Sequence, residues 1–129
     1  MSKKGVNGIL IIGRDPARVE QLKRVVMHLN STWIVNVDSF ADAEFVVEKQ
    51  VPEVLILELS DFSYGEFVRK IEPFILKMPG SVKTLLVEPE PTVESVVRAS
   101  EIGVDGIIKA PVSHYTISTL LAQIDSAKG

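Results

Sequence analysis

Short runs of apolar residues alternate along the chain with segments in which apolar residues recur every three or four positions. Short apolar runs rich in β-branched residues are typical of buried strands, and the longer spacing is typical of helices with one buried face. The pattern therefore predicts five strands in strict alternation with five helices. The predicted strands are 8–12, 33–37, 54–59, 82–87 and 105–109, and the helices follow Asp15, Ser39 and Ser113 or cover about 64–76 and 92–102.

Capping residues stand at several of the predicted helix ends. Asp15, Ser39 and Ser113 each directly precede a helical pattern, where a side-chain oxygen can accept from free backbone N–H groups. Gly103 follows the fourth helix and is expected to end it in a left-handed conformation. Pro73 lies inside the third predicted helix, which it should kink or end because proline lacks a backbone N–H.

Strands one, three and four are almost wholly apolar, which is typical of a parallel sheet covered by helices on both faces. With 129 residues, 46% of them hydrophobic, the chain is predicted to form one doubly wound α/β domain over residues 1–129. Such folds bind ligands beyond the carboxyl ends of the strands. The residues expected there are Gly13, Arg14, Asp15, Glu58, Glu88 and Ala110.

The overall composition excludes several classes of function. A net charge of −3 without clustered Lys or Arg argues against direct binding of nucleic acid. The absence of cysteine excludes disulfides, thiolate catalysis and cysteine-ligated metals. The apolar run at residues 9–12 is too short for a signal peptide or a membrane span. We therefore expect a cytoplasmic protein that does not enter a membrane.

Glu58 stands out because it interrupts the apolar run 54–59. Burying an ionised carboxylate is costly unless the group is paired or solvated. Glu58 is therefore predicted to lie at a strand end, at the mouth of a cleft.

Four stretches at these strand ends carry a family resemblance: ILIIGRDP, PEVLILELSDF, LLVEP and IGVDGIIKAP. They resemble, over nearly the whole chain, the receiver domain of two-component response regulators, in which the matching stretches read ILIVDDDP, PDLVLLDLxMP, xLTA and AGADGYLLKP. The resemblance implies a CheY-like, flavodoxin-like (βα)5 fold with strand order 2-1-3-4-5. In that family two acids bind Mg²⁺, an aspartate accepts the phosphoryl group, and a hydroxyl and a lysine contact the phosphoryl oxygens.

The reactive residues of that family are all replaced in this chain. Gly13 and Arg14 stand in place of the two metal-binding acids, and Glu58 stands in place of the phosphoacceptor. Glu88 replaces the hydroxyl residue, and Ala110 replaces the lysine. The chain thus resembles a pseudo-receiver with a vestigial phosphorylation pocket.

Two neighbouring positions complete the comparison with the family. Lys109 stands one residue before the position of the family's lysine, and its side chain should point to the other face because strand side chains alternate. Pro111 is retained, and in the family the lysine-proline peptide bond is cis. The resemblance therefore predicts a cis bond between Ala110 and Pro111.

Phosphoryl transfer needs a metal and other cations to neutralise the charge that develops on the phosphoryl oxygens. The predicted pocket offers only one arginine and two carboxylates, so we expect no phosphorylation, no metal, no cofactor and no enzymatic activity. Arg14 is predicted to supply the missing positive charge by pairing with Glu58, Glu88 or both. Glu58 is open to two interpretations: a permanent mimic of aspartyl phosphate, or drift in a domain that kept only its fold.

In the family, the surface of helix four, strand five and helix five mediates contacts with partners. The resemblance therefore implies a bacterial signalling domain that acts by protein-protein interaction with a signalling protein or another receiver, or as a homodimer through this face. The alternative is the receiver part of a longer response regulator, hybrid enzyme or DNA-binding regulator that still takes part in a phosphorelay. The expected interaction face comprises Glu94, Arg98, Glu101, Asp105, Lys109 and Tyr115.

Three remaining residues have ordinary structural explanations. Trp33 opens the second predicted strand and is expected to pack against the core. His28 and His114 are expected to be surface residues and not phosphotransfer or metal sites, because nothing else in their surroundings indicates such chemistry.

Overall fold

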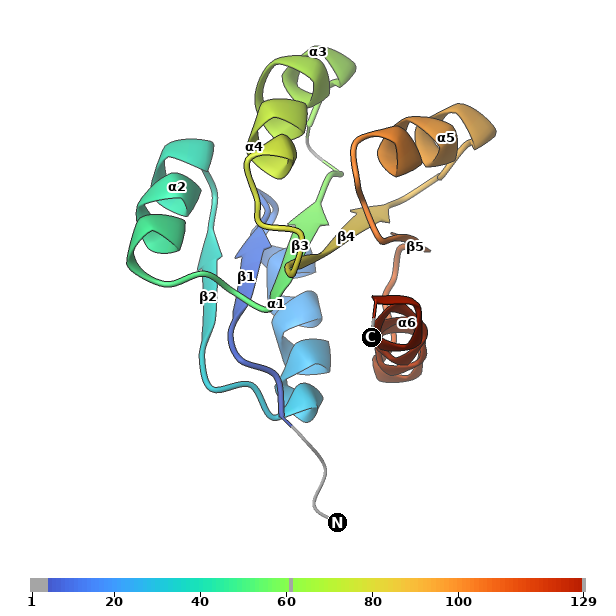
Figure 1. Ribbon diagram of the computed structural model, residues 1–129. Helices are drawn as coiled ribbons and strands as arrows, with labels where there is room; N and C mark the ends of the chain where they lie inside the picture. Colours follow the sequence, from blue (N-terminus) through green and yellow to red (C-terminus); the bar gives the residue numbers. More distant parts are fainter. Residues whose placement is uncertain (1–4, 61, 129) are drawn as a thin grey trace.

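The structure is a computed structural model that describes residues 5–60 and 62–128. Its strands form one parallel sheet in the order β2-β1-β3-β4-β5 (Figure 1). The predicted doubly wound sheet and its strand order are confirmed. The strands are β1 (Ile9–Ile12), β2 (Ile34–Val37), β3 (Val54–Glu58), β4 (Lys83–Glu88) and β5 (Gly106–Lys109).

Helices cover both faces of the sheet (Figure 1). Each face of the sheet is covered by its own group of helices. The first face carries α1 (Pro16–Val26) and α6 (His114–Lys128), and the second carries α2 (Phe40–Lys49), α4 (Glu72–Leu76) and α5 (Val93–Glu101).

The alternation of side chains along each strand supplies both cores. In β1, Ile9 and Ile11 pack on the side of α1 and α6, whereas Leu10 and Ile12 pack on the opposite side. All four side chains are fully buried. Because both faces of the sheet are covered, an unbroken apolar run is the expected sequence of a central strand.

The third predicted helix is divided into three segments. These are α3 (Tyr64–Glu66), a π-helical turn η2 (Phe67–Ile71) and α4. The N–H of Glu72 donates to the carbonyl of Phe67, which is the wider hydrogen-bond spacing of a π-helix. Pro73 is the second residue of α4 and follows this wider turn directly. Pro73 interrupts the regular helix as predicted, but the helix does not end there.

The predicted caps are confirmed. The side chain of Asp15 accepts from the N–H groups that open α1, and Ser39 accepts from the N–H of Asp42 at 3.1 Å. Ser113 likewise caps α6, and Gly103 has a φ of 92° after α5. Strand and helix ends otherwise differ from the predicted ranges by only a few residues.

A buried lysine at the start of β4 joins the sheet to α6. Lys83 donates to Glu53 at 3.0 Å and also pairs with Asp125. Burial of the ammonium group opposes its charge, but the hydrogen bonds from Lys83 to Asp125 and Glu53 outweigh burial and raise the pKa of Lys83. This cluster lies at the amino-terminal edge of the sheet, away from the candidate site.

Candidate functional site

Glu58 is the last residue of β3 and is only 1% exposed. The hydroxyl of Ser60 donates to its Oε2 atom at 2.5 Å. Its Oε1 atom is buried and accepts from no group of residues 5–60 and 62–128. Glu58 therefore lies at a strand end, as predicted, but its carboxylate is much more deeply buried than a position at the mouth of a cleft implies.

Arg18 is linked to Glu58 through the hydroxyl of Ser60. Its Nη1 atom donates to the Ser60 hydroxyl at 2.9 Å, and its Nε atom lies 3.4 Å from Oδ2 of Asp15. Asp15, Arg18, Ser60 and Glu58 thus form one polar chain. Sequence reasoning missed Arg18; the only signal was its position three residues after the cap Asp15, which places the two side chains together on the first turn of α1.

A pocket of about 510 Å³ lies over Glu58 at the carboxyl ends of the strands. It contains Glu58 and the two residues that the resemblance placed beside it, Ala110 and Pro111. Most of the lining is apolar. The remaining residues that line it are Ala17, Arg18, Gln21, Leu22, Val87, Pro89 and Val112.

Gly13 lies close to the side chains of Val19 and Glu58. A Cβ atom at position 13 would lie 2.7 Å from Val19 Cγ2 and 3.1 Å from the Cβ of Glu58. Real Cβ atoms do not approach that closely without a shift of the neighbour. With Val19 and Glu58 in these positions, glycine fits at position 13 where a residue with a side chain would not.

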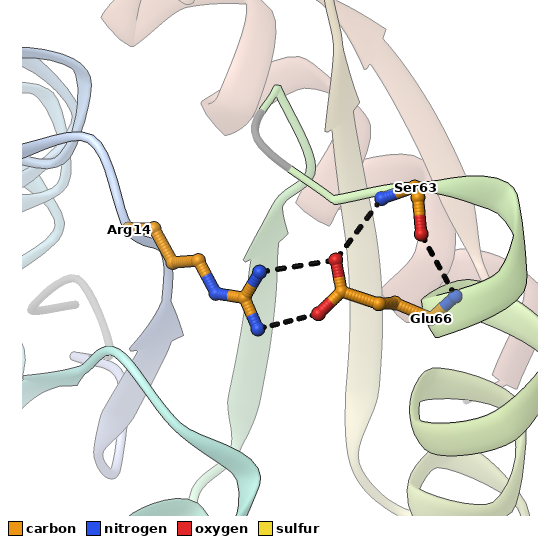
Figure 2. A network of polar contacts seen from close by, with 3 residues as sticks. All are labelled: Arg14, Ser63 and Glu66. Carbon is orange, nitrogen blue, oxygen red and sulfur yellow. Dashed lines mark hydrogen bonds and ion pairs between the residues drawn. The ribbon is translucent and has the colours of Figure 1, made fainter.

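The prediction that Arg14 pairs with Glu58 or Glu88 is wrong. Arg14 binds Glu66 at the start of the third helix with two hydrogen bonds, at 3.0 and 2.6 Å (Figure 2). Its guanidinium carbon also lies 4.1 Å from the centre of the Phe62 ring. A bidentate carboxylate and an aromatic face together hold the guanidinium more favourably than the single free oxygen of Glu58 does.

Ser63 forms two further hydrogen bonds with Glu66. The Ser63 N–H donates to the Glu66 carboxylate, and the Ser63 hydroxyl accepts from the Glu66 N–H, both at 3.2 Å (Figure 2). The hydrogen bond from Arg14, supported by that from Ser63, lowers the pKa of Glu66. Arg14 therefore ties the end of β1 to the helix after β3 and lies outside the pocket lining.

Glu88 is the last residue of β4, but it does not line the pocket over Glu58. It lines a groove of about 580 Å³ between the segment after β3 and α5. Burial raises the pKa of Glu88, and a hydrogen bond from the Ser95 side chain partly opposes that rise. The sequence placed Glu88 in one pocket with Glu58, whereas the structure separates the two acids.

The bond between Ala110 and Pro111 is cis, as predicted. Ala110 lines the pocket, while Lys109 is exposed and takes no part in the lining. The alternation of side chains in β5 therefore turns Lys109 away from the site, as expected. In residues 5–60 and 62–128, no three acidic or histidine side chains are grouped as a metal site requires.

The predicted interaction face is mixed in character. Glu94, Glu101, Lys109 and Tyr115 are exposed. Arg98, in contrast, is engaged within the fold, because it binds Glu72 on α4 at 2.7 and 2.5 Å. Asp105 is engaged as well, since its carboxylate accepts from the N–H of Thr84 at 2.8 Å.

Sequence reasoning missed the apolar part of this face. Val93, Val96 and Val97 on α5 are 80%, 48% and 53% exposed. Their spacing is that of one helical stripe, so the signal was present in the sequence. It was ambiguous because the same spacing is expected of the buried face of a helix, which Ala99 and Ile102 provide here.

The two histidines are exposed, as predicted, but they are also in contact. The rings of His28 and His114 lie 4.9 Å apart between centroids. His28 belongs to the short 3₁₀ turn η1 (Met27–Leu29) that follows α1, and His114 is the first residue of α6. In the described part of the chain, no helix combines the length and the apolar character that crossing a membrane requires.

No protein-family model and no curated protein sequence matches this chain. Solved structures do match it closely in shape. A CheY-like receiver domain of a response regulator from Methanospirillum hungatei is similar, with a TM-score of 0.75, 17% identity and coverage of 96% of this chain and 98% of that one. The fold is that of CheY-like receiver domains.

Two further structures come from other kinds of protein. A CheY-like protein, TadZ, from Pseudomonas aeruginosa has a TM-score of 0.72 and 10% identity, and covers 92% of this chain and 98% of its own. A protein provisionally assigned to pilus assembly, from Burkholderia pseudomallei, has a TM-score of 0.78 and 15% identity, with coverage of 98% and 94%. At these identities the similarity establishes the fold.

Proposed function

We propose that this protein is a receiver-like signalling domain of the bacterial cytoplasm that works by binding a protein partner, without being phosphorylated and without catalysis. The chemistry at the strand ends supports the first half of the proposal. The acceptor position holds a buried glutamate, the lysine position holds Ala110, and Arg14 is committed to Glu66. These positions offer no cation to neutralise a phosphoryl group, and Arg18, which lines the pocket, is already bonded to Ser60 and paired with Asp15.

The observation that carries the binding proposal is the exposed valine stripe of α5. Val93, Val96 and Val97 leave a contiguous helical stripe of apolar surface in water. Contiguous apolar surface of this kind is typical of protein interfaces, because its removal from water drives association. We propose that α5, with β5 and the exposed Tyr115 of α6, meets a signalling protein, another receiver or a second copy of this chain.

Phosphorylation is expected to fail. Incubation with acetyl phosphate and Mg²⁺, or with beryllofluoride and Mg²⁺, should leave the mass and the amide NMR spectrum unchanged. A conventional receiver treated in parallel shows that the reagents are active. An acyl-phosphate adduct on any residue would contradict the proposal and favour the alternative, a receiver that still takes part in a phosphorelay.

Substitution of Val96 by aspartate should weaken partner binding at least about tenfold, because it places an unpaired charge in the apolar centre of the interface. Self-association of the pure protein is measured by analytical ultracentrifugation, and partner capture is measured from extracts of the source cell. The matched control is Val51→Asp, since Val51 is 44% exposed in the loop before β3. Equal binding by the parent and both variants would show that α5 is not the interface.

A further inference from the structure

The groove that Glu88 lines has apolar side chains on both of its sides. It lies beyond the carboxyl ends of β3 and β4, between the segment after β3 and α5 (Figure 1). Phe62 and Phe67 line one side, and Val93 and Val97 of α5 line the other. These two valines are 80% and 53% exposed, so the groove holds apolar surface in contact with water. Covering such surface with another apolar group is favourable.

The side formed by the segment after β3 is held in place by contacts within the fold. The ring of Phe62 packs edge-on against the ring of Phe40, with 5.8 Å between the centroids. The guanidinium carbon of Arg14 lies 4.1 Å from the centre of the Phe62 ring, and Glu66 binds that guanidinium with two hydrogen bonds. Phe67 begins the π-helical turn η2, and such turns are frequent at functional sites. A groove with an ordered wall binds a partner at a smaller entropic cost than one that must first be ordered.

Most of the charged side chains around the groove are acidic. Glu88, Glu94 and Glu101 belong to its lining, and Glu94 and Glu101 are exposed. Arg98 is the one basic residue in the described lining, and a carboxylate of α4 binds its guanidinium at 2.7 and 2.5 Å. Asp61 lies outside the described residues, and its charge has the same sign as that of the glutamates. The groove therefore combines negative charge with apolar surface.

These two properties together select the kind of molecule that fits. The exposed valines favour a ligand with an aliphatic or aromatic side chain, because a strongly hydrated ligand would leave them in water. The glutamates favour a ligand with positive charge and repel an acidic one. A protein segment in which Lys or Arg flanks an apolar side chain has both properties. The long stems of Lys and Arg can also lie on apolar surface while their charged ends reach carboxylates at the rim.

We propose that this groove docks a segment of a partner protein in which an aliphatic or aromatic side chain is flanked by Lys or Arg. The apolar side chain packs between Phe67 and Val97, and the basic side chains pair with Glu94 and Glu101. The volume of about 580 Å³ lies within the range of about 300–1,000 Å³ that is typical of ligand pockets. The proposal rests on the proposed function in that the partner is a protein. It adds the groove to the exposed face of α5, since Val96 lies outside the groove lining.

The test is an NMR titration of the pure protein with three acetylated and amidated hexapeptides, KLFRLK, ELFELE and KSNRSK. The first combines both properties, the second reverses the charge, and the third lacks the apolar side chains. KLFRLK should produce saturable shifts of the amide signals of Phe67, Val93 and Val97. The other two peptides should bind at least about tenfold more weakly, because each lacks one of the two attractive contributions. Added NaCl should weaken the binding of KLFRLK, since salt screens exposed charges.

A matched pair of variants tests the contribution of charge. The double variant Glu94→Gln/Glu101→Gln should weaken the binding of KLFRLK about threefold to tenfold and reduce its dependence on NaCl, because two exposed ion pairs are lost. The control is Glu20→Gln/Glu48→Gln, which removes the same charge from exposed positions on α1 and α2. The control should bind KLFRLK like the parent protein.

A second matched pair tests the contribution of apolar surface. Val97→Ser removes apolar surface from the groove and should weaken the binding of KLFRLK at least about fivefold. The control is Val51→Ser, since Val51 is 44% exposed in the loop before β3 and lies outside the groove lining. This control should also bind KLFRLK like the parent protein.

Several results would overturn the proposal. KLFRLK might give no saturable shifts, or one of the other peptides might bind equally well, or both groove variants might bind KLFRLK like the parent. Saturable shifts of the same amide signals with Mg²⁺ or Ca²⁺ that prevent peptide binding would assign the carboxylates to a metal ion. Shifts of these signals with protein concentration alone would assign the groove to a second copy of the chain.

The variant Val96→Asp separates this proposal from the proposed function. Because Val96 lies outside the groove lining, Val96→Asp should not weaken the binding of KLFRLK. Binding of KLFRLK in the groove, together with partner binding that is unaffected by Val96→Asp, would support the groove and contradict the exposed face of α5. Partner binding that is lost in Val96→Asp, without any binding of KLFRLK, would overturn the groove and support that face.

Discussion

Replacement of Gly8 by alanine is expected to lower the free energy of unfolding by about 2–5 kcal/mol. Gly8 has a φ of 91°, a conformation that side chains rarely adopt. A Cβ atom there would also lie 2.3–2.6 Å from three atoms of the Trp33 indole. The substitution therefore adds backbone strain to a steric overlap at the entry to the central strand β1.

Substitutions at two other glycines separate the cost of the backbone strain from the cost of the steric overlap. Gly103 has nearly the same φ, 92°, but a Cβ there meets nothing within 4 Å, so Gly103→Ala measures the backbone strain alone, about 1–2 kcal/mol. Gly80→Ala also meets nothing, and it lacks the positive φ, so it should be nearly neutral. Trp33 is the only tryptophan, so urea unfolding can be followed by its fluorescence. Equal losses for Gly8→Ala and Gly103→Ala would show that the indole yields without cost.

Substitution of Glu58 by methionine is expected to raise the free energy of unfolding by about 1–2 kcal/mol. The carboxylate is 1% exposed, and only one of its oxygens has a partner in the described part of the chain. Methionine has a similar volume and carries no charge that must be removed from water. Ser60 loses its acceptor but keeps the hydrogen bond from Arg18.

The control for this prediction is Glu88→Met, at the end of β4. Glu88 is only partly buried and has a hydrogen bond from Ser95, so its replacement should change stability less than that of Glu58. Both variants are compared with the parent by urea unfolding. A loss of stability in Glu58→Met would mean that the carboxylate is well satisfied in the fold. A gain of stability in Glu58→Met would show that Glu58 lowers the stability of the domain, as is expected of a residue that is kept for binding.

Much of the fold was predictable from local patterns. The apolar run at 9–12 and the caps Asp15, Ser39 and Ser113 each indicated an element that the structure contains. Gly103 ends α5 in the predicted left-handed conformation. These signals are reliable because each depends on a few neighbouring residues and on hydrogen bonds within one helix end or one strand.

The partners of charged side chains were much less predictable. Arg14 and Glu58 lie at the ends of neighbouring strands, and pairing them followed from that proximity. The structure places Arg14 on Glu66, which lies 52 residues away in the chain, and surrounds Glu58 with Ser60 and an apolar pocket. A long side chain can reach several partners, so its choice depends on the positions of all of them and on the course of the loop after β3.

The sequence by itself determined the doubly wound fold and the strand ends at which the pocket forms, because these depend on the order and type of residues along the chain. Only the tertiary structure decided how deeply Glu58 is buried and which carboxylate Arg14 binds. It also decided that Glu88 lines a different groove from the pocket over Glu58. The physical reason is that burial and pairing are properties of contacts between elements. The orientation of α5 and the turn after β3 set those contacts, and neither is encoded in a short stretch of sequence.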